Sequence, residues 1–232
     1  DKAEALYAEK KYVEAAEEFE RVVGSDPKSK FADKALFNAG QAYQLAKHWN
    51  SAARVFEQIV TEPRFAGSQF RQDALVNLAE NHRRFFAFDK AIHRYQALVK
   101  EFPTVKQAAY ALFMSARLLE MTGRLAEAAQ VYERYSNEYN MRDNAMSALF
   151  QTGLVYEKMK DVNAQIRLFR TFIKRFSTTP GSDARIVEAN MRLGDLFQTK
   201  KDWKTAKRYY EQTIKNFQAR GLAPGITGRL CQ

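Results

Sequence analysis

The chain has 232 residues, of which 46% are hydrophobic and 28% are charged, and its formal net charge is +10. This hydrophobic content can supply a sizeable core and argues against disorder, while the scarcity of proline and glycine favours helix over sheet. No stretch approaches the ~18 apolar residues that a membrane-spanning helix needs. The single cysteine, Cys231, excludes an intramolecular disulfide and a thiolate zinc cluster.

Six segments along the chain share an alanine followed four residues later by an aromatic residue, as in "YVEAAEEFERVV" near the start and "DWKTAKRYYEQTI" near the end. The anchor positions recur at nearly constant intervals, and they are Ala15, Ala52, Ala91, Ala128, Gln165 and Ala206. The aromatic column is Phe19, Phe56, Tyr95, Tyr132, Phe169 and Tyr210. Such a regular period predicts one structural unit repeated along the chain.

A second pattern lies upstream of the second to sixth segments, with an apolar residue, a small residue four positions later and a larger residue three positions after that. Leu36, Gly40 and Tyr43 are one instance. These intervals keep the three side chains on one helix face, so each repeat is predicted to contain two helices. The small column is Gly40, Ala79, Ala116, Gly153 and Gly194. We expect it to face the alanine column of the second helix, with the aromatic residues filling the remaining gap.

These residues resemble the tetratricopeptide repeat, whose helix–turn–helix unit has the same order of small and aromatic positions and a closing proline. Pro27, Pro63 and Pro103 occupy that closing position. The resemblance implies an all-α fold, a right-handed α-solenoid of about six repeats forming a single domain over 1–232. The expected repeats are 1–29, 30–67, 68–103, 104–141, 142–179 and 180–221, with 222–232 as a linker or the start of a further repeat. Because the chain begins with Asp1, we expect a fragment of a larger protein.

The repeats are longer than the ~34 residues of a typical unit. In this respect the chain is similar to bacterial cell-envelope members of the family, such as the Tol-associated periplasmic division coordinator and the lipoprotein of the outer-membrane assembly machine. Elongated repeats also occur in cytoplasmic bacterial scaffolds. The periplasm or cell envelope is therefore the favoured location, with the cytoplasm as the alternative.

No constellation of catalytic residues is evident. The three histidines, His48, His82 and His93, lie on separate predicted helices without metal-ligand spacing. His82 falls in a packing column and His93 in a column of solvent-facing residues. Nucleophile and phosphate-loop motifs are missing too. We therefore expect no enzyme activity, no cofactor, no metal and no small-molecule substrate.

In this family the first helices line a concave groove, which is the expected binding surface for a protein partner. The candidate groove residues are Phe37, Gln41, Asn77, Glu80, Arg83, Tyr110, Phe113, Arg117, Phe150, Glu157, Met191 and Asp195. The apolar members would suit an extended or helical peptide, but they fit contact with the helix of the adjacent repeat equally well. The leading hypothesis is a non-catalytic interaction scaffold in a bacterial envelope or motility assembly.

The C-terminal part of the chain is basic, because 14 Lys and Arg residues outnumber six acidic residues from position 161 onward. The candidate basic patch is Arg167, Arg170, Lys174, Arg175, Lys200, Lys201, Lys204, Lys207 and Arg208. A solvated outer face is the simpler interpretation of these charges. The alternative function is docking on an anionic surface, such as an acidic protein, lipid headgroups or nucleic acid. Nucleic acid is the least favoured of these, because the aromatic residues are committed to the core columns.

Overall fold

The structure is a computed structural model that describes residues 2–140 and 144–219. Those residues form helices, turns and loops, and the chain divides into two compact units, residues 1–118 and residues 119–232. Cys231 and the predicted segment 222–232 lie outside the described residues. The helices of the first unit are α1 (Lys2–Ala8), α2 (Tyr12–Ser25), α3 (Ala32–Leu45), α4 (Trp49–Thr61), the short 3-10 helix η1 (Pro63–Phe65), α5 (Arg71–Arg84), α6 (Phe88–Glu101) and most of α7 (Lys106–Met121).

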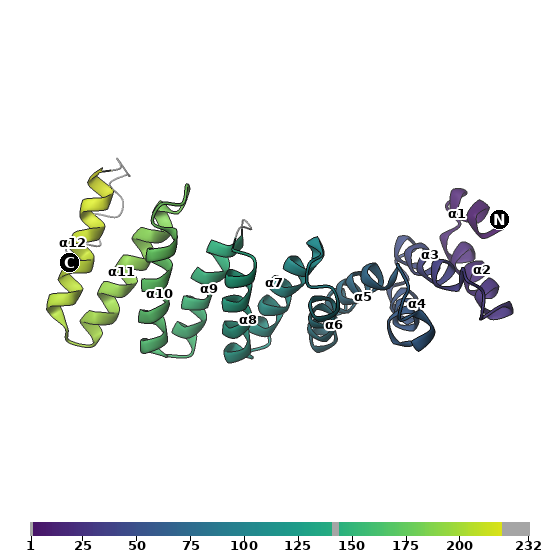
Figure 1. Ribbon diagram of the computed structural model, residues 1–232, viewed down its shortest axis with the longest axis horizontal. Coiled ribbons are helices and arrows are strands. Elements are labelled where there is room, and N and C mark those ends of the chain that lie inside the picture. Colours follow the sequence, from purple (N-terminus) through teal and green to yellow (C-terminus); the bar gives the residue numbers. More distant parts are fainter. Residues whose placement is uncertain (1, 141–143, 220–232) are drawn as a thin grey trace. The chain divides into compact units, whose positions relative to one another are not determined.

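The second unit contains the end of α7, then α8 (Leu125–Glu138), α9 (Asn144–Lys158), α10 (Val162–Phe176), α11 (Asp183–Thr199) and α12 (Trp203–Ala219). Helices α8 to α12 follow one another side by side in chain order (Figure 1), and each packs against its sequence neighbours. The same sequential packing joins α1 to α5 and α5 to α6 in the first unit. The predicted all-α fold of paired helices is confirmed.

The glycines of the small column make room for the aromatic ring of the same repeat. A Cβ atom added to Gly40 would lie 2.5 Å from ring atoms of Phe56, and one added to Gly153 would lie 2.6 Å from the Phe169 ring. Both rings are fully buried. The small residue therefore faces the aromatic residue itself, whereas the sequence pattern predicted that it would face the alanine. The glycine is required here because any side chain would occupy the space of the ring.

The turn inside each helix pair ends the first helix with one residue in the left-handed region. After α3, Lys47 has a φ of 61°, its N–H donates to the Gln44 carbonyl, and the N–H of His48 donates to the Tyr43 carbonyl at 2.8 Å. This is a Schellman motif, in which glycine is the usual residue. The residues at this position are Lys10, Lys47, Phe86, Gly123, Lys160 and Lys201. The chain thus places a side chain at most of these turn apices.

The predicted proline stops are confirmed. Helix α2 ends before Pro27, α4 before Pro63 and α6 before Pro103. Proline disfavours the helical conformation of the residue before it, so the second helix of the repeat ends there.

Gln165, which replaces the usual alanine, does not disrupt α10. Its side chain is buried and its Nε2 donates to the Tyr156 carbonyl at 3.4 Å.

Each unit has its own apolar core between the helices. In the first unit Leu36, Ile59, Leu75 and Leu78 are fully or almost fully buried. The core of the second unit includes the buried phenylalanines Phe150, Phe169, Phe172 and Phe176. Burial of such side chains stabilises the fold by about 1.5–3 kcal/mol each relative to exposure. The helix faces that remain outside these cores carry the candidate functional residues.

Candidate partner-binding surfaces

The expectation of an open apolar series does not hold for Phe37 and Phe150, because both side chains are buried. The Phe37 ring lies 5.1 Å from that of Phe70, which precedes the first helix of the next repeat. The Phe150 ring lies 5.2 Å from that of Phe172 in its own repeat. These residues are therefore part of the core. Phe113 and Met191 are half-buried, so the apolar series is discontinuous.

Glu80 is the centre of a polar cluster in the first unit. Its carboxylate accepts hydrogen bonds from Arg83 Nη2 at 2.7 Å, from the Tyr110 hydroxyl at 2.8 Å and from the Tyr95 hydroxyl. Burial by itself raises the pKa of Glu80, but these hydrogen bonds outweigh it and hold the pKa below its usual value. Burial and the neighbouring Glu80 carboxylate both raise the pKa of Tyr110. The cluster is thus a charged, preorganised group with the half-exposed Tyr110 at its edge.

The structure therefore brings together Glu80, Arg83 and Tyr110 from the set predicted for the groove. Asn77 lies on the same helix, and its Nδ2 donates to the Asp73 carbonyl at 2.8 Å. Gln41 on α3 and Arg117 on α7 are exposed. These two residues belong to the first helices of their repeats and do not enter the Glu80 cluster.

A second polar group lies on α9 and α11 of the second unit. Arg192 contacts Glu157 at 2.6 Å and Glu188 at 3.0 Å. Asp195, one turn further along α11, accepts a hydrogen bond from the Tyr210 hydroxyl at 2.7 Å. The predicted residues Glu157 and Asp195 therefore belong to polar networks that link neighbouring helices.

Glu120 was not among the predicted site residues, although it is the centre of a comparable cluster. Its carboxylate accepts from the Tyr132 hydroxyl at 3.1 Å, from Gln151 at 2.9 Å and from Lys158 at 2.6 Å. A sequence signal for these clusters exists. Each tyrosine of the aromatic column, Tyr95, Tyr132 and Tyr210, donates to a carboxylate on the first helix of its own repeat. A tyrosine in a column that also accepts phenylalanine predicts such a polar partner, because a buried hydroxyl needs one.

Two residues of the predicted basic patch contact side chains of other helices. Arg175 donates to the side chain of Ser136 at 3.0 Å and to its carbonyl, so it joins α10 to α8 and is not a free surface charge. Burial lowers its pKa from the usual value. Arg170 donates to the Tyr209 hydroxyl at 3.0 Å and lies over the Phe197 ring.

Arg170 and the remaining members of the patch, apart from Arg175, are exposed. Arg167 lies 3.5 Å from Glu133, and Lys207 lies 3.7 Å from Glu211. Lys200 contacts an asparagine on α10. The remaining members are Lys174, Lys201, Lys204 and Arg208, with the Arg208 guanidinium over the Tyr209 ring. The exposed lysines are concentrated toward the turn between α11 and α12.

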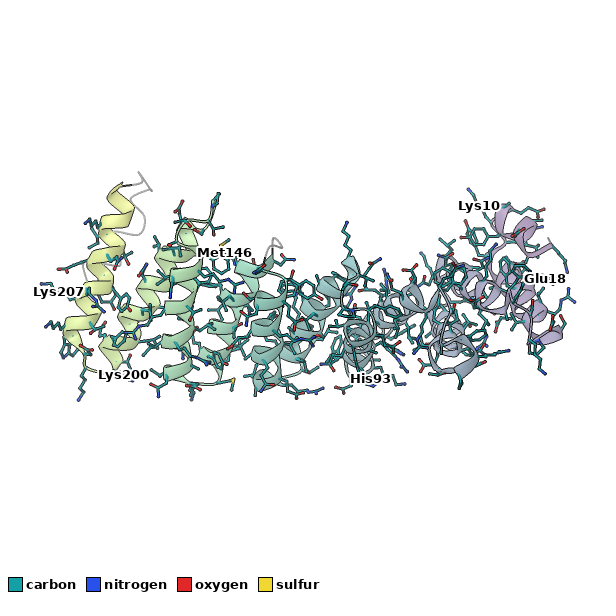
Figure 2. All side chains as sticks on the ribbon, in the orientation of Figure 1. Lys10, Glu18, His93, Met146, Lys200 and Lys207 are labelled. Atoms are coloured by element: carbon teal, nitrogen blue, oxygen red, sulfur yellow. The ribbon has the colours of Figure 1, made fainter. Side chains whose placement is uncertain are left out.

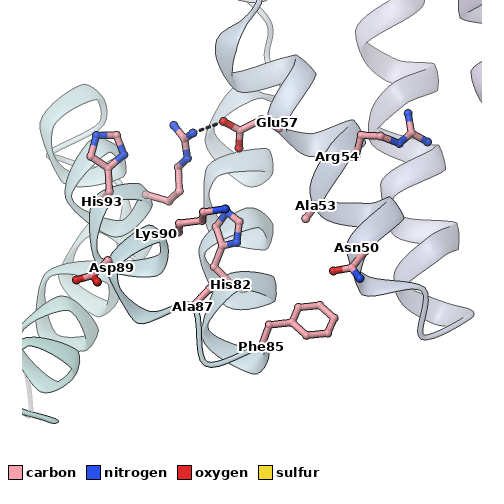
Figure 3. Close-up of a pocket in the computed structure, with 11 residues that line it drawn as sticks. Asn50, Ala53, Arg54, Glu57, His82, Phe85, Ala87, Asp89, Lys90 and His93 are labelled. Carbon is pink, nitrogen blue, oxygen red and sulfur yellow. Dashed lines mark hydrogen bonds and ion pairs between the residues drawn. The ribbon is translucent and has the colours of Figure 1, made fainter. Parts of the chain in front are cut away.

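A hollow of about 660 Å³ lies between α4 and α6 in the first unit, next to the end of α5 (Figure 3). Arg94 on α6 is hydrogen-bonded to Glu57 on α4 across the hollow. Arg54, which also lines the hollow, pairs with Glu20 on α2 at 2.7 Å. His82 lines the hollow and is only half-buried, so it packs less completely than its column predicted. Burial lowers its pKa, and the nearby cations add to this effect.

The hollow has a mixed lining and does not form a metal site. Its wall includes Phe85, Asp89, Lys90 and His93. His93 is exposed, as its sequence column predicted. Among the described residues, no three His, Cys, Asp or Glu side chains lie close enough together to bind a metal ion. None of the described helices combines the length and the apolar character needed to cross a membrane.

Helix pairs packed in sequence, with a glycine of one helix against an aromatic ring of the next, define a helical-repeat protein. Sequence profiles of the tetratricopeptide repeat match residues 34–63, 75–140, 147–179 and 188–218, which together form more than half of the chain. The chain belongs to the tetratricopeptide repeat family. Proteins of this family are typically non-catalytic scaffolds that bind other proteins.

Individual relatives are distant. Protein KINESIN LIGHT CHAIN-RELATED 1 of Arabidopsis thaliana is 21% identical over 164 residues, which are 66% of this chain and only 27% of that protein. Among solved structures, MamA protein matches with a TM-score of 0.52 and 14% identity, covering 83% of this chain and 96% of MamA. BtubC from P. vanneervenii matches with a TM-score of 0.50 and 15% identity, covering 97% and 94% of the two chains. At these identities the structural likenesses show the fold alone.

Proposed function

We propose that the protein is a non-catalytic scaffold that binds a partner protein along the faces of its first helices. The Glu80 cluster carries this proposal. It holds a carboxylate, a guanidinium and an exposed tyrosine in fixed positions on one face, with its internal hydrogen bonds already formed. Such preorganised groups bind a polar segment of a partner at a low entropic cost. Tyrosine and arginine are also the residues that most often dominate interfaces.

The predicted binding face is modified by the burial of Phe37 and Phe150. With these rings in the core, the face is polar, with Tyr110 and the half-buried Phe113 as its apolar parts. We therefore expect a partner segment that contributes hydrogen bonds, charges opposite to those of Glu80 or Arg83, and a small apolar side chain that contacts Tyr110. The exposed residues Gln41 and Arg117 extend this face along α3 and α7.

Site-specific crosslinking tests the proposal. A photoreactive amino acid replaces Tyr110 in the full-length protein, and a control replaces the exposed Gln96 on the second helix α6. Illumination in the producing cells is expected to link a defined partner to position 110 and not to position 96. Addition of Glu80→Gln should weaken that crosslink, because it removes the charge that orients Arg83 and Tyr110. Equal labelling at both positions would contradict a binding face on the first helices.

The setting proposed for this scaffold is a bacterial envelope or motility assembly. Its support is the length of the repeats, which exceeds the ~34 residues of a typical unit, and the resemblance to envelope proteins that this length implies. An alkaline phosphatase fusion to the full-length gene product tests the compartment. Phosphatase activity is expected only if the repeats are exported, and an inactive but stable fusion would refute this part of the proposal.

A further inference from the structure

Two turns of the second unit form a single basic edge. The turn between α9 and α10 lies beside the turn between α11 and α12, at the same end of the helices (Figure 1). Lys200 Nζ contacts Asn163 Oδ1 at 3.0 Å and so joins the end of α11 to the start of α10. Figure 2 shows Lys200 at this lower end and Met146 at the opposite one. We call these residues the turn edge: Met159, Lys160, Lys200, Lys201, Trp203 and Lys204.

The two aspartates of these turns, Asp161 and Asp202, offset only part of the charge of the turn edge. Asp161 Oδ1 accepts the N–H of Ala164 at 2.9 Å, and Asp202 Oδ1 accepts the N–H of Thr205 at 3.1 Å. Each carboxylate therefore caps a helix N-terminus, where it offsets the positive end of the helix dipole. Hydrogen bonds from Thr205, and then the charges of Arg208 and Lys204, lower the pKa of Asp202, so this carboxylate offsets part of the lysine charge. The turn edge has four lysines beside two aspartates, and a net positive charge remains.

Two of the lysines stand where glycine would be easier to accommodate. Lys160 and Lys201 have φ values of 59° and 60° at the apices of their turns, whereas Gly123 has the equivalent position in the first turn of this unit. A residue with a side chain is strained in this conformation, and glycine is not. Lysine also occupies the equivalent apices Lys10 and Lys47 in the first unit, so what Lys160 and Lys201 contribute to the turn edge is their charge.

The turn edge also exposes large apolar side chains among the lysines. Trp203 is 61% exposed and Met159 is 37% exposed. Trp203 is the first residue of α12, with Lys201 and Lys204 on either side of it in the sequence. Tryptophan favours the boundary between water and hydrocarbon, because its ring is apolar and its N–H is polar. Lysines beside it can keep their charges in water while their stems lie along apolar surface.

We propose that the turn edge binds the surface of a membrane rich in anionic lipids, with Trp203 entering the headgroup layer. This goes beyond the binding of a protein partner along the first helices. Clustered lysines attract anionic headgroups with about 1 kcal/mol per residue. The edge offers separate ammonium groups on two turns around a protruding tryptophan. That arrangement fits a broad layer of headgroups better than a single strand of nucleic acid, which is usually held by stacking on several aromatic rings.

Vesicle sedimentation tests the proposal directly. The full chain is mixed with phosphatidylcholine vesicles, or with the same vesicles containing about 30% phosphatidylglycerol as the anionic lipid. We expect binding to the anionic vesicles only, and weaker binding as NaCl rises from about 50 to about 500 mM. In a Trp49→Phe background, which leaves Trp203 as the single tryptophan, its fluorescence should shift to the blue on binding.

The decisive variant is Lys160→Gly with Lys201→Gly. This variant removes two charges and relieves the backbone strain at both left-handed positions. The protein should therefore unfold at the same or a higher temperature. Its affinity for anionic vesicles should fall about 30-fold. The matched control is Lys174→Gln with Lys215→Gln, two exposed lysines away from the turns on α10 and α12, and it should bind within about 3-fold of wild type.

Three results would overturn the proposal: no binding to anionic vesicles at about 50 mM NaCl, equal losses in the two variants, or an unshifted Trp203 spectrum. Binding of duplex DNA in place of vesicles, sensitive to the same glycine substitutions, would reassign the edge to nucleic acid. A salt-sensitive capture of polyglutamate without vesicle binding would assign it to an acidic protein.

Discussion

Replacing Gly153 by alanine should destabilise the second unit by about 2 kcal/mol, the balance of an overpacking cost and a gain in helix propensity. The new Cβ would lie 2.6 Å from Phe169 Cζ and 3.2 Å from Leu168 Cδ2. The Phe169 ring cannot retreat easily, because it is fully buried and lies 5.6 Å from the Phe150 ring. Overpacking of this kind costs up to ~3 kcal/mol, and alanine returns ~1 kcal/mol through its higher helix propensity.

Urea and thermal unfolding followed by circular dichroism measure this effect, and the expected fall in Tm is about 4–8 °C. Gly24→Ala is the matched control, because a Cβ at Gly24 meets no atom within 4 Å. It should be neutral or stabilise the protein by up to ~1 kcal/mol. The double variant with Phe169→Leu should lose less stability than the sum of the single changes, since leucine vacates part of the ring volume. A neutral Gly153→Ala variant would refute the argument that the glycine is required by the ring.

Three further predictions concern the first unit. Phe86→Gly should raise the stability by about 1 kcal/mol, because Phe86 has a φ of 57° and is 79% exposed, so little packing is lost; an unchanged or lower Tm would contradict this. Tyr95→Phe should cost about 1–2 kcal/mol in urea unfolding, since it leaves the Glu80 carboxylate with one fewer donor, whereas the more exposed Tyr110→Phe should cost less. Glu80 has a lowered pKa in the folded protein, so its contribution to stability is complete above the unfolded pKa of ~4.3 and is lost as the pH falls through the folded pKa. The stability difference between wild type and Glu80→Gln should therefore shrink on acidification below pH ~4.3, and a constant difference would show that the carboxylate charge is not involved.

The repeated helix pairs were predictable from the sequence because their determinants are local. The spacing of Gly40 and Tyr43 on one helix, and of Ala52 and Phe56 on the next, defines the buried face of each helix. Pro63 ends the second helix through a local steric effect that does not depend on how the rest of the chain is packed. The detail that Gly40 faces the ring of Phe56 was missed, because two columns can be paired in more than one register across a helix interface.

The candidate site was predictable only in part. Glu80, Arg83 and Tyr110 were assigned to one face and do lie together. Phe37 was assigned to an equivalent face but is buried. Its position borders the packing stripe, and whether such a side chain is covered depends on the segment before the next repeat, where Phe70 stacks against it. Helical periodicity contains no information about that contact.

The sequence by itself determined the number of repeats, the helix type and the residues of the packing columns, since each follows from spacing within one repeat or between consecutive repeats. The tertiary structure alone decided which charges remain available. Arg175 is held against Ser136 on α8, whereas Lys201 protrudes at a turn apex. In the sequence alone, Arg175 and Lys201 are equivalent members of a basic segment. The difference arises from hydrogen bonds between residues that are a whole repeat apart in the chain, and such contacts exist only after the helices have packed.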